Sequence, residues 1–148
     1  MSFETILIPV DFSEDSLYAL QEGILLAKKF NSKLLILHVN HDESMLFHYL
    51  SDEEFEELKQ RIVKDVQAQL EKLEEKFPEL KDLDYHYRIR RGVPYVEIVE
   101  ETEKEKVDLV IVGSHGRTSA KKFFYGGTTS KVARRAKCSV MITRKVNK

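Results

Sequence analysis

Glycines and hydroxyl side chains recur at a fixed spacing in the last third of the chain, in a pattern suited to holding an anion. The pattern is Gly-x2-Gly-x9-Gly-Gly followed by two threonines, and the residues of interest are Gly113, His115, Gly116, Arg117, Gly126, Gly127, Thr128 and Thr129. Glycine lets a backbone approach an anion closely. The N–H groups at a helix start stabilise phosphate charge, and threonine hydroxyls can donate as well. Glycines also serve tight turns alone, but four that frame a helix start in a segment without acids favour a phosphate-binding loop.

Two other strand ends carry residues that a ligand would meet. Pro9-Val10-Asp11 follows the first apolar run, and Asp11 either binds a ribose hydroxyl or adenine amino group or takes part in capping the next helix. Val39 ends the second run, where its backbone groups can face an adenine edge. Within the glycine pattern, His115 either contacts a phosphate when protonated or is an exposed loop side chain.

These residues need a scaffold, and the apolar pattern predicts one. Five short apolar runs are typical of strands, and nearly continuous ones suit a parallel sheet covered on both faces. The strands predicted are Thr5–Val10, Lys33–Val39, Tyr85–Arg90, Val107–Val112 and Ser139–Thr143. Helical patterns alternate with them, which predicts right-handed crossovers and helices on both faces. Ligands of such sheets bind at the carboxyl ends of strands, so the positions after Val10, Val39 and Val112 should form the site.

Local signals set the ends of the predicted helices. Ser13 is expected to cap the first, and Ser51-Asp-Glu-Glu54 is a capping box for the second, which should end at Pro78. Pro94 suits the first turn of the third helix, and the fourth is predicted from about Thr129 to Lys137. The apolar stripe of the second helix is interpreted as ordinary core, not as a surface for a partner.

Length and composition bound the class of protein. The 148 residues, 42% hydrophobic and 33% charged, predict one globular domain over 1–148. No apolar run approaches the ~20 residues needed to cross a membrane, and the N-terminus lacks a secretory pattern, so a cytoplasmic protein is expected. The net charge of −1 hides a basic segment, because no Asp or Glu follows Gly113. Such a segment attracts anions, either a phosphorylated ligand or nucleic acid, or is a solvated face.

Several chemistries are excluded by what the sequence lacks. The P-loop motif and the Gly-x-Ser-x-Gly elbow are both absent. The five histidines and the single Cys138 form no zinc spacing, so no metal ligands are predicted within the chain. No paired carboxylates or nucleophile–base pair stand near the glycine loop, so no catalytic residue is predicted. At most slow ATP hydrolysis is expected.

Five segments in order resemble the universal stress protein family over essentially the whole chain. They are Ile6–Ser13, Leu37–Val39, Gly92–Pro94, the Gly113-x2-Gly116-x9-Gly126 loop, and Val132–Thr143. The resemblance implies a Rossmann-like α/β fold, an open twisted five-stranded parallel sheet in the order 3-2-1-4-5 with helices on both faces.

The same resemblance implies a ligand and an assembly. It places adenosine at Asp11 and Val39 and phosphates at Gly113, Gly116, Gly126 and the residues just after it, with ATP or ADP as ligand and Mg²⁺ beside the triphosphate. It also implies a homodimer through the last strand, Ser139–Thr143, whose pairing would cover a sheet edge. One position departs from the family pattern: Gly127 stands where the family has Ser or Thr. Losing one hydroxyl contact costs about 1 kcal/mol, unless Thr128 or Thr129 replaces it.

Four functions are consistent with these observations. The first is a nucleotide-binding stress-response regulator, and the second is a dimeric regulator of the same fold that binds no nucleotide. The third is an enzyme that uses a bound nucleotide, for which no catalytic base is evident. The fourth is nucleic-acid binding by the basic segment, which lacks aromatic residues at stacking spacing and is therefore disfavoured.

Overall fold

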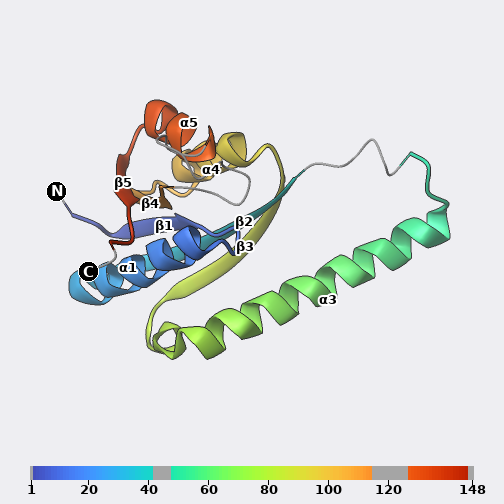
Figure 1. Cartoon of the computed structure of the whole chain (residues 1–148), viewed down its shortest axis with the longest axis horizontal. Coiled ribbons are helices and arrows are strands. Elements are labelled where there is room, and N and C mark those ends of the chain that lie inside the picture. Colours follow the sequence, from blue (N-terminus) through green and yellow to red (C-terminus); the bar gives the residue numbers. More distant parts are fainter. Residues whose placement is uncertain (1, 42–47, 115–126, 147–148) are drawn as a thin grey trace.

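A parallel sheet of five strands forms the centre of the molecule (Figure 1). The computed structural model describes residues 2–41, 48–114 and 127–146. Its strand order is β3-β2-β1-β4-β5, and every pairing is parallel, so the predicted fold class is confirmed. The strands are β1 (Thr5–Pro9), β2 (Lys33–His41), β3 (Tyr85–Gly92), β4 (Leu109–Gly113) and β5 (Ser139–Thr143). The helices are α1 (Glu14–Phe30), α3 (Asp52–Lys76), the short 3₁₀ helix η1 (Pro78–Asp82), α4 (Pro94–Lys104) and α5 (Gly127–Arg135).

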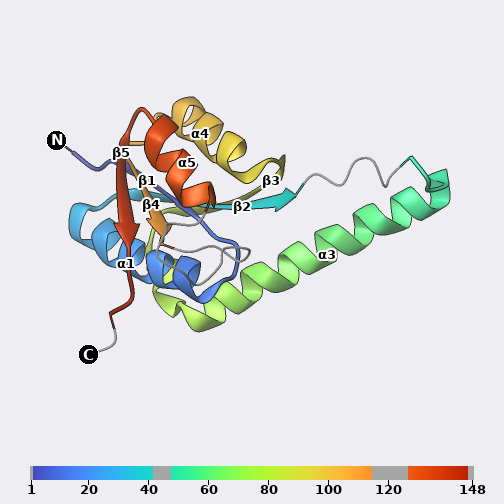
Figure 2. The same ribbon diagram turned by 45° about the horizontal axis from the view of Figure 1, so that its top comes forward.

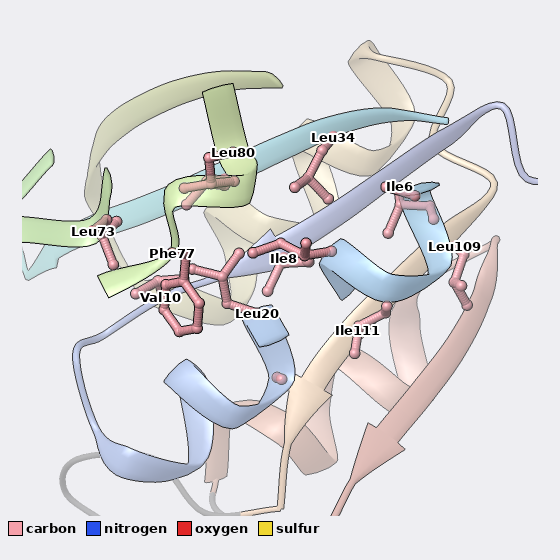
Figure 3. Close-up of a cluster of buried hydrophobic side chains, with 14 residues drawn as sticks. Ile6, Ile8, Val10, Leu20, Leu34, Leu73, Phe77, Leu80, Leu109 and Ile111 are labelled. Atoms are coloured by element: carbon pink, nitrogen blue, oxygen red, sulfur yellow. The ribbon is translucent and has the colours of Figure 1, made fainter. Parts of the chain in front are cut away.

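Helices cover both faces of the sheet, because successive strand residues point to opposite sides. In β1, Ile6 and Ile8 face a cluster that includes Leu20 of α1, shown in Figure 3. Leu7 of the same strand faces the other way, into a cluster that includes Ile98 of α4. Figure 2 shows α4 and α5 together on the face opposite α1. The two clusters hold the strand ends in place.

The element boundaries differ from the prediction by one or two residues at several ends. β1 ends at Pro9, one residue before the predicted end, and β2 runs on to His41. β3 likewise extends to Gly92, and β4 begins at Leu109. The fourth predicted helix begins at Gly127, not near Thr129, so the two residues after Gly126 belong to its first turn. Extra length at β2 and β3 arises because these strands pair with each other beyond the end of β1.

Helix α3 departs most from what its sequence suggested. It has 25 residues, and Leu73 near its C-terminal end is the one buried residue among them. Leu73, Phe77 and Leu80 anchor that end in the cluster on the α1 face of the sheet. The N-terminal half stands away from the sheet in both views (Figures 1 and 2). The interpretation of its whole apolar stripe as ordinary core is therefore wrong.

Candidate functional site

The turn after β1 is shaped by hydrogen bonds that also start α1. Oδ1 of Asp11 accepts from the Ser13 amide at 3.0 Å, and the Ser13 hydroxyl oxygen accepts from the Ser16 amide at 3.2 Å. Phe12 between them has a φ of 63°, an unusual conformation for a non-glycine residue. Ser13 is thus the cap, as predicted, and Asp11 supports it. These bonds hold the half-buried Asp11 carboxylate at the carboxyl end of β1.

The backbone of Val39 faces the space beyond the end of β1. The β1–β2 register stops at Pro9 opposite Leu37, and the Leu37 carbonyl accepts from the Val10 amide at 2.8 Å. The N–H and C=O of a strand residue point to the same side, and that side repeats every second residue. Val39 therefore presents both groups on the β1 side, two residues past the last β1 partner. A main-chain donor and a main-chain acceptor therefore lie side by side beyond the end of β1.

A buried histidine ties these two strand ends together. His38 is 8% exposed, and its Nδ1 lies 2.7 Å from the Val10 carbonyl oxygen, to which it donates. Its ring also contacts the Phe12 ring, with 5.1 Å between centroids. Sequence reasoning used His38 only to exclude a zinc site, and the structure gives His38 a structural role beside Val10. The sequence signal for this structural role was the position of His38, one residue before Val39 and therefore on the opposite face of β2.

Gly113 lies where β4 meets the start of α1. A Cβ added there would lie 2.8 Å from both the carbonyl carbon and oxygen of Asp15. Since these are backbone atoms, no side-chain rotation relieves that contact. Glycine at this position is therefore needed for the approach of α1 to β4, whatever a ligand requires. Val112 before it is buried, and the amide of Ser114 after it donates to the Thr143 carbonyl in β5.

The start of α5 is joined to the same strand end. The buried Thr129 hydroxyl donates to the Gly113 carbonyl oxygen at 2.6 Å. Gly127 is exposed, and a Cβ built on it would meet nothing within 4 Å. Thr128 is half-buried. With the Thr129 hydroxyl hydrogen committed to Gly113, Thr128 is the better placed substitute for the hydroxyl that position 127 lacks.

These contacts make one connected set of strand ends. Val39 and Val10 are joined through His38 and Leu37, and Gly113 meets α1 four residues after Asp11. Four further predicted site residues, His115, Gly116, Arg117 and Gly126, lie outside the described residues. Across the described ranges, no group of three or more His, Cys, Asp or Glu side chains is arranged to hold a metal ion.

Part of the basic C-terminal segment is engaged with an aromatic ring on α4. Lys131 Nζ and the Arg135 guanidinium carbon each lie 4.8 Å from the centroid of the Tyr95 ring. Such contacts favour a packed role for these two cations on α5.

A second charged group, which sequence reasoning missed, lies between β3 and α4. Glu101 is 2% exposed and accepts from Arg88 at 2.8 Å, with Arg90 at 3.1 Å from its other oxygen. Arg88 also pairs with Glu105, and that hydrogen bond lowers the pKa of the Glu105 carboxyl. The alternation Arg88-Ile-Arg90 in a strand was the signal for it. This network fastens α4 to the sheet, and Arg90 in it is the register partner of Val39 on the neighbouring strand.

Comparison with known proteins agrees with this architecture. A model of the universal stress protein family matches residues 2–144. The chain belongs to the universal stress protein family. Two curated universal stress proteins of Methanocaldococcus jannaschii are each 30% identical to it: MJ0531, covering 99% of this chain and 85% of the relative, and MJ0577, covering 98% and 97%. The solved structure of MJ0577 superposes with a TM-score of 0.81 at 29% identity over 100% of both chains.

More distant universal stress proteins share the fold and were solved with nucleotides. One is a complex with cAMP, with a TM-score of 0.72, 23% identity and coverage of 99% of this chain and 100% of that one. Another, from Arabidopsis thaliana, has AMP bound, with a TM-score of 0.65, 22% identity and coverage of 96% and 92%. At these identities the likeness to this chain concerns the fold.

Proposed function

We propose that this universal stress protein is a cytoplasmic regulator that binds ATP or ADP between the carboxyl ends of β1, β2 and β4. The observation that carries the proposal is the Val39 backbone, whose N–H and C=O face the space beyond the end of β1, the strand that Asp11 follows. Adenine would lie against Val39, and Asp11 would accept from the ribose. The connection of Thr129 to Gly113 sets the first turn of α5 beside the same end of β4, where its amides favour phosphate charge.

We infer that a triphosphate would bind together with its metal ion. The described part of the chain offers no cluster of metal ligands, so Mg²⁺ would be held mainly by the phosphates of the nucleotide. The phosphates would be bound by Gly113, Gly116, Gly126, Gly127 and Thr128. Positive charge would be added by His115 and Arg117. No catalytic residue is assigned, so bound nucleotide would act by changing shape or partners, with at most slow hydrolysis.

A comparison of two aspartates tests the adenosine end. Asp11→Ala should weaken adenosine and ATP alike, by about tenfold for one lost hydrogen bond of about 1.4 kcal/mol. Asp108→Ala is the matched control, because Asp108 accepts from the Thr5 amide at the opposite end of the sheet. Isothermal titration of both ligands, after removal of copurified nucleotide, measures the effect. If Asp11→Ala weakened ATP binding alone, Asp11 would not be at the adenosine end of the site.

The phosphate end is tested at Gly116. Gly116→Val should abolish the approach of phosphates and leave adenosine binding intact, whereas unchanged ATP affinity would refute the loop assignment. Gly127→Ser should tighten ATP binding, since it supplies a hydroxyl at a position with open space. An unchanged affinity there would mean that Thr128 already fills that role.

A regulator that binds no nucleotide is the second candidate. It is favoured by Gly127 and by the Thr129 hydroxyl, which already donates to Gly113. Mass spectrometry of small molecules released from the purified, denatured protein separates the two candidates. Copurified ATP or ADP supports nucleotide binding, and its absence together with no binding by titration supports the second candidate.

We also propose a homodimer through β5, in which nucleotide binding alters the pairing. β5 lies at one end of the sheet order and holds no charged residue. An antiparallel pair about a twofold axis sets Met141 of one copy opposite Met141 of the other. Met141→Glu places two carboxylates together there and should halve the mass measured by light scattering. An unchanged mass would contradict this interface.

A further inference from the structure

The projecting half of α3 carries an apolar stripe that the described part of its own chain does not bury. Phe55, Leu58 and Ile62 recur at spacings of three and four residues, on one side of the helix. None of the three is buried, and the neighbouring Val63 is 55% exposed. The ammonium of Lys59 lies over the Phe55 ring, 4.4 Å from its centroid, so the helix supplies part of the cover for its own stripe.

Charge along the same half of α3 is separated into two blocks. Residues 52–57 contain five carboxylates and no cation, and residues 59–64 contain three cations and no carboxylate. A parallel, in-register pair of these helices would set acid against acid and base against base, which is unfavourable. An antiparallel pair would set each acidic block against the basic block of the other copy, so the order of charges selects this orientation.

We propose that the N-terminal half of α3 binds the same segment of a second copy of this chain, antiparallel, about a twofold axis beside Leu58. In that register Glu54 of one copy faces Arg61 of the other along one side of the stripe. Glu56 faces Lys59 along the other side. Phe55, Leu58 and Ile62 of both copies fill the space between. One self-complementary patch on each subunit is what a twofold interface requires.

The salt bridge within the free helix is compatible with this pairing. Lys59 Nζ lies 3.6 Å from Glu56 Oε1 of the same helix, and both side chains are more than half exposed. Such a surface pair contributes little, so exchange for a partner's carboxylate costs little. The pairing uses no residue of the candidate nucleotide site or of β5, and it stands independently of the proposed function.

Charge reversal tests the pairing in the full-length protein. An acidic variant carries Lys59→Glu and Arg61→Glu, and a basic variant carries Glu54→Lys and Glu56→Lys. Each alone should lose self-association through α3 and show a lower mass than the wild type by sedimentation equilibrium. An equimolar mixture should recover the wild-type mass, because the two helices are then complementary. Circular dichroism checks that each variant keeps its helix content. Equal masses for the wild type and both variants would overturn the proposal and leave the stripe to a different partner.

Disulfide formation tests the orientation. In a Cys138→Ala background, protein with Glu54→Cys mixed with protein with Arg61→Cys should give a mixed disulfide on mild oxidation. A parallel pair would instead link each variant to itself, which would overturn the antiparallel arrangement. Lys64→Cys is the matched control, since position 64 is exposed on the side of α3 away from the stripe and should give no link.

Discussion

Helices α1 and α3 begin in the same way and end in different surroundings. Each has a serine cap whose hydroxyl oxygen accepts from the amide three residues on, at 3.2 Å in both. Each has acidic residues in its first turn and an apolar stripe. Yet α1 buries six residues against the sheet, whereas α3 buries one. A stripe in the sequence shows which side of a helix is apolar, and the tertiary structure decides whether that side is covered.

The largest expected difference between the two helices lies in their leucines. Leu20→Ala in α1 should lower the free energy of unfolding by about 3 kcal/mol, because the side chain is 0% exposed and its removal leaves a cavity. Leu58→Ala in α3 should lower it by less than about 1 kcal/mol, since no core is disturbed. Urea denaturation of dilute protein measures both. Equal losses would mean that α3 packs on the body of the protein.

The two serine caps sharpen the same comparison at a smaller scale. Ser13→Ala should cost about 1 kcal/mol of global stability, since fraying of α1 exposes the core. Ser51→Ala removes the matching bond, but its effect should stay local, because the first turns of α3 can open without unfolding the sheet. Hydrogen exchange should show faster exchange of amides near Glu54 at nearly unchanged global stability. A global loss equal to that of Ser13→Ala would contradict this independence.

The smallest effect is expected at Tyr87, which packs against the cluster that anchors α3. Its buried hydroxyl has no hydrogen-bond partner among the described residues. Tyr87→Phe should therefore raise the free energy of unfolding slightly, by about 0.5 kcal/mol. A loss of stability at neutral pH would show that the hydroxyl has a partner.

The pH dependence of the same variant gives an independent check. Burial raises the pKa of Tyr87 from 10.0 to about 12. Tyr87 therefore ionises at a lower pH in the unfolded chain than in the folded protein. The contribution of the neutral Tyr87 to the free energy of unfolding is present below pH 10 and is lost as the pH rises toward 12. Tyr87→Phe should remove the part of the stability loss at alkaline pH that comes from Tyr87. Urea denaturation between pH 10 and pH 12 measures this difference. If the free energy of unfolding fell equally steeply with pH in the variant and the wild type, the raised pKa of Tyr87 would be contradicted.

Much of the fold was predictable because it rests on local patterns. Continuous apolar runs marked the strands, and Ser13 and Ser51 marked two helix starts correctly. The errors have tertiary causes. β2 extends beyond its predicted end because β3 pairs with it up to His41. α3 extends away from the sheet although its apolar stripe continues along the helix.

The sequence predicted where the candidate site lies, but not the hydrogen bonds and close contacts within it. The carboxyl ends of β1, β2 and β4 follow from the alternation of elements. The bond from His38 to Val10 joins residues 28 positions apart. The approach of Asp15 in α1 to Gly113 joins residues about a hundred positions apart, and no local pattern encodes either contact. Gly113 illustrates the consequence: a residue chosen for ligand binding is already required by packing.

The anchoring of α3 at one end makes the helix a lever. At 1.5 Å per residue, the arm from Leu73 to Asp52 is about 30 Å long. A rotation of about 10° at the buried end would carry the tip through ~5 Å, more than the length of a hydrogen bond. The packing of a few side chains around Leu73 and Phe77 therefore sets where five carboxylates and three cations are presented to the surroundings.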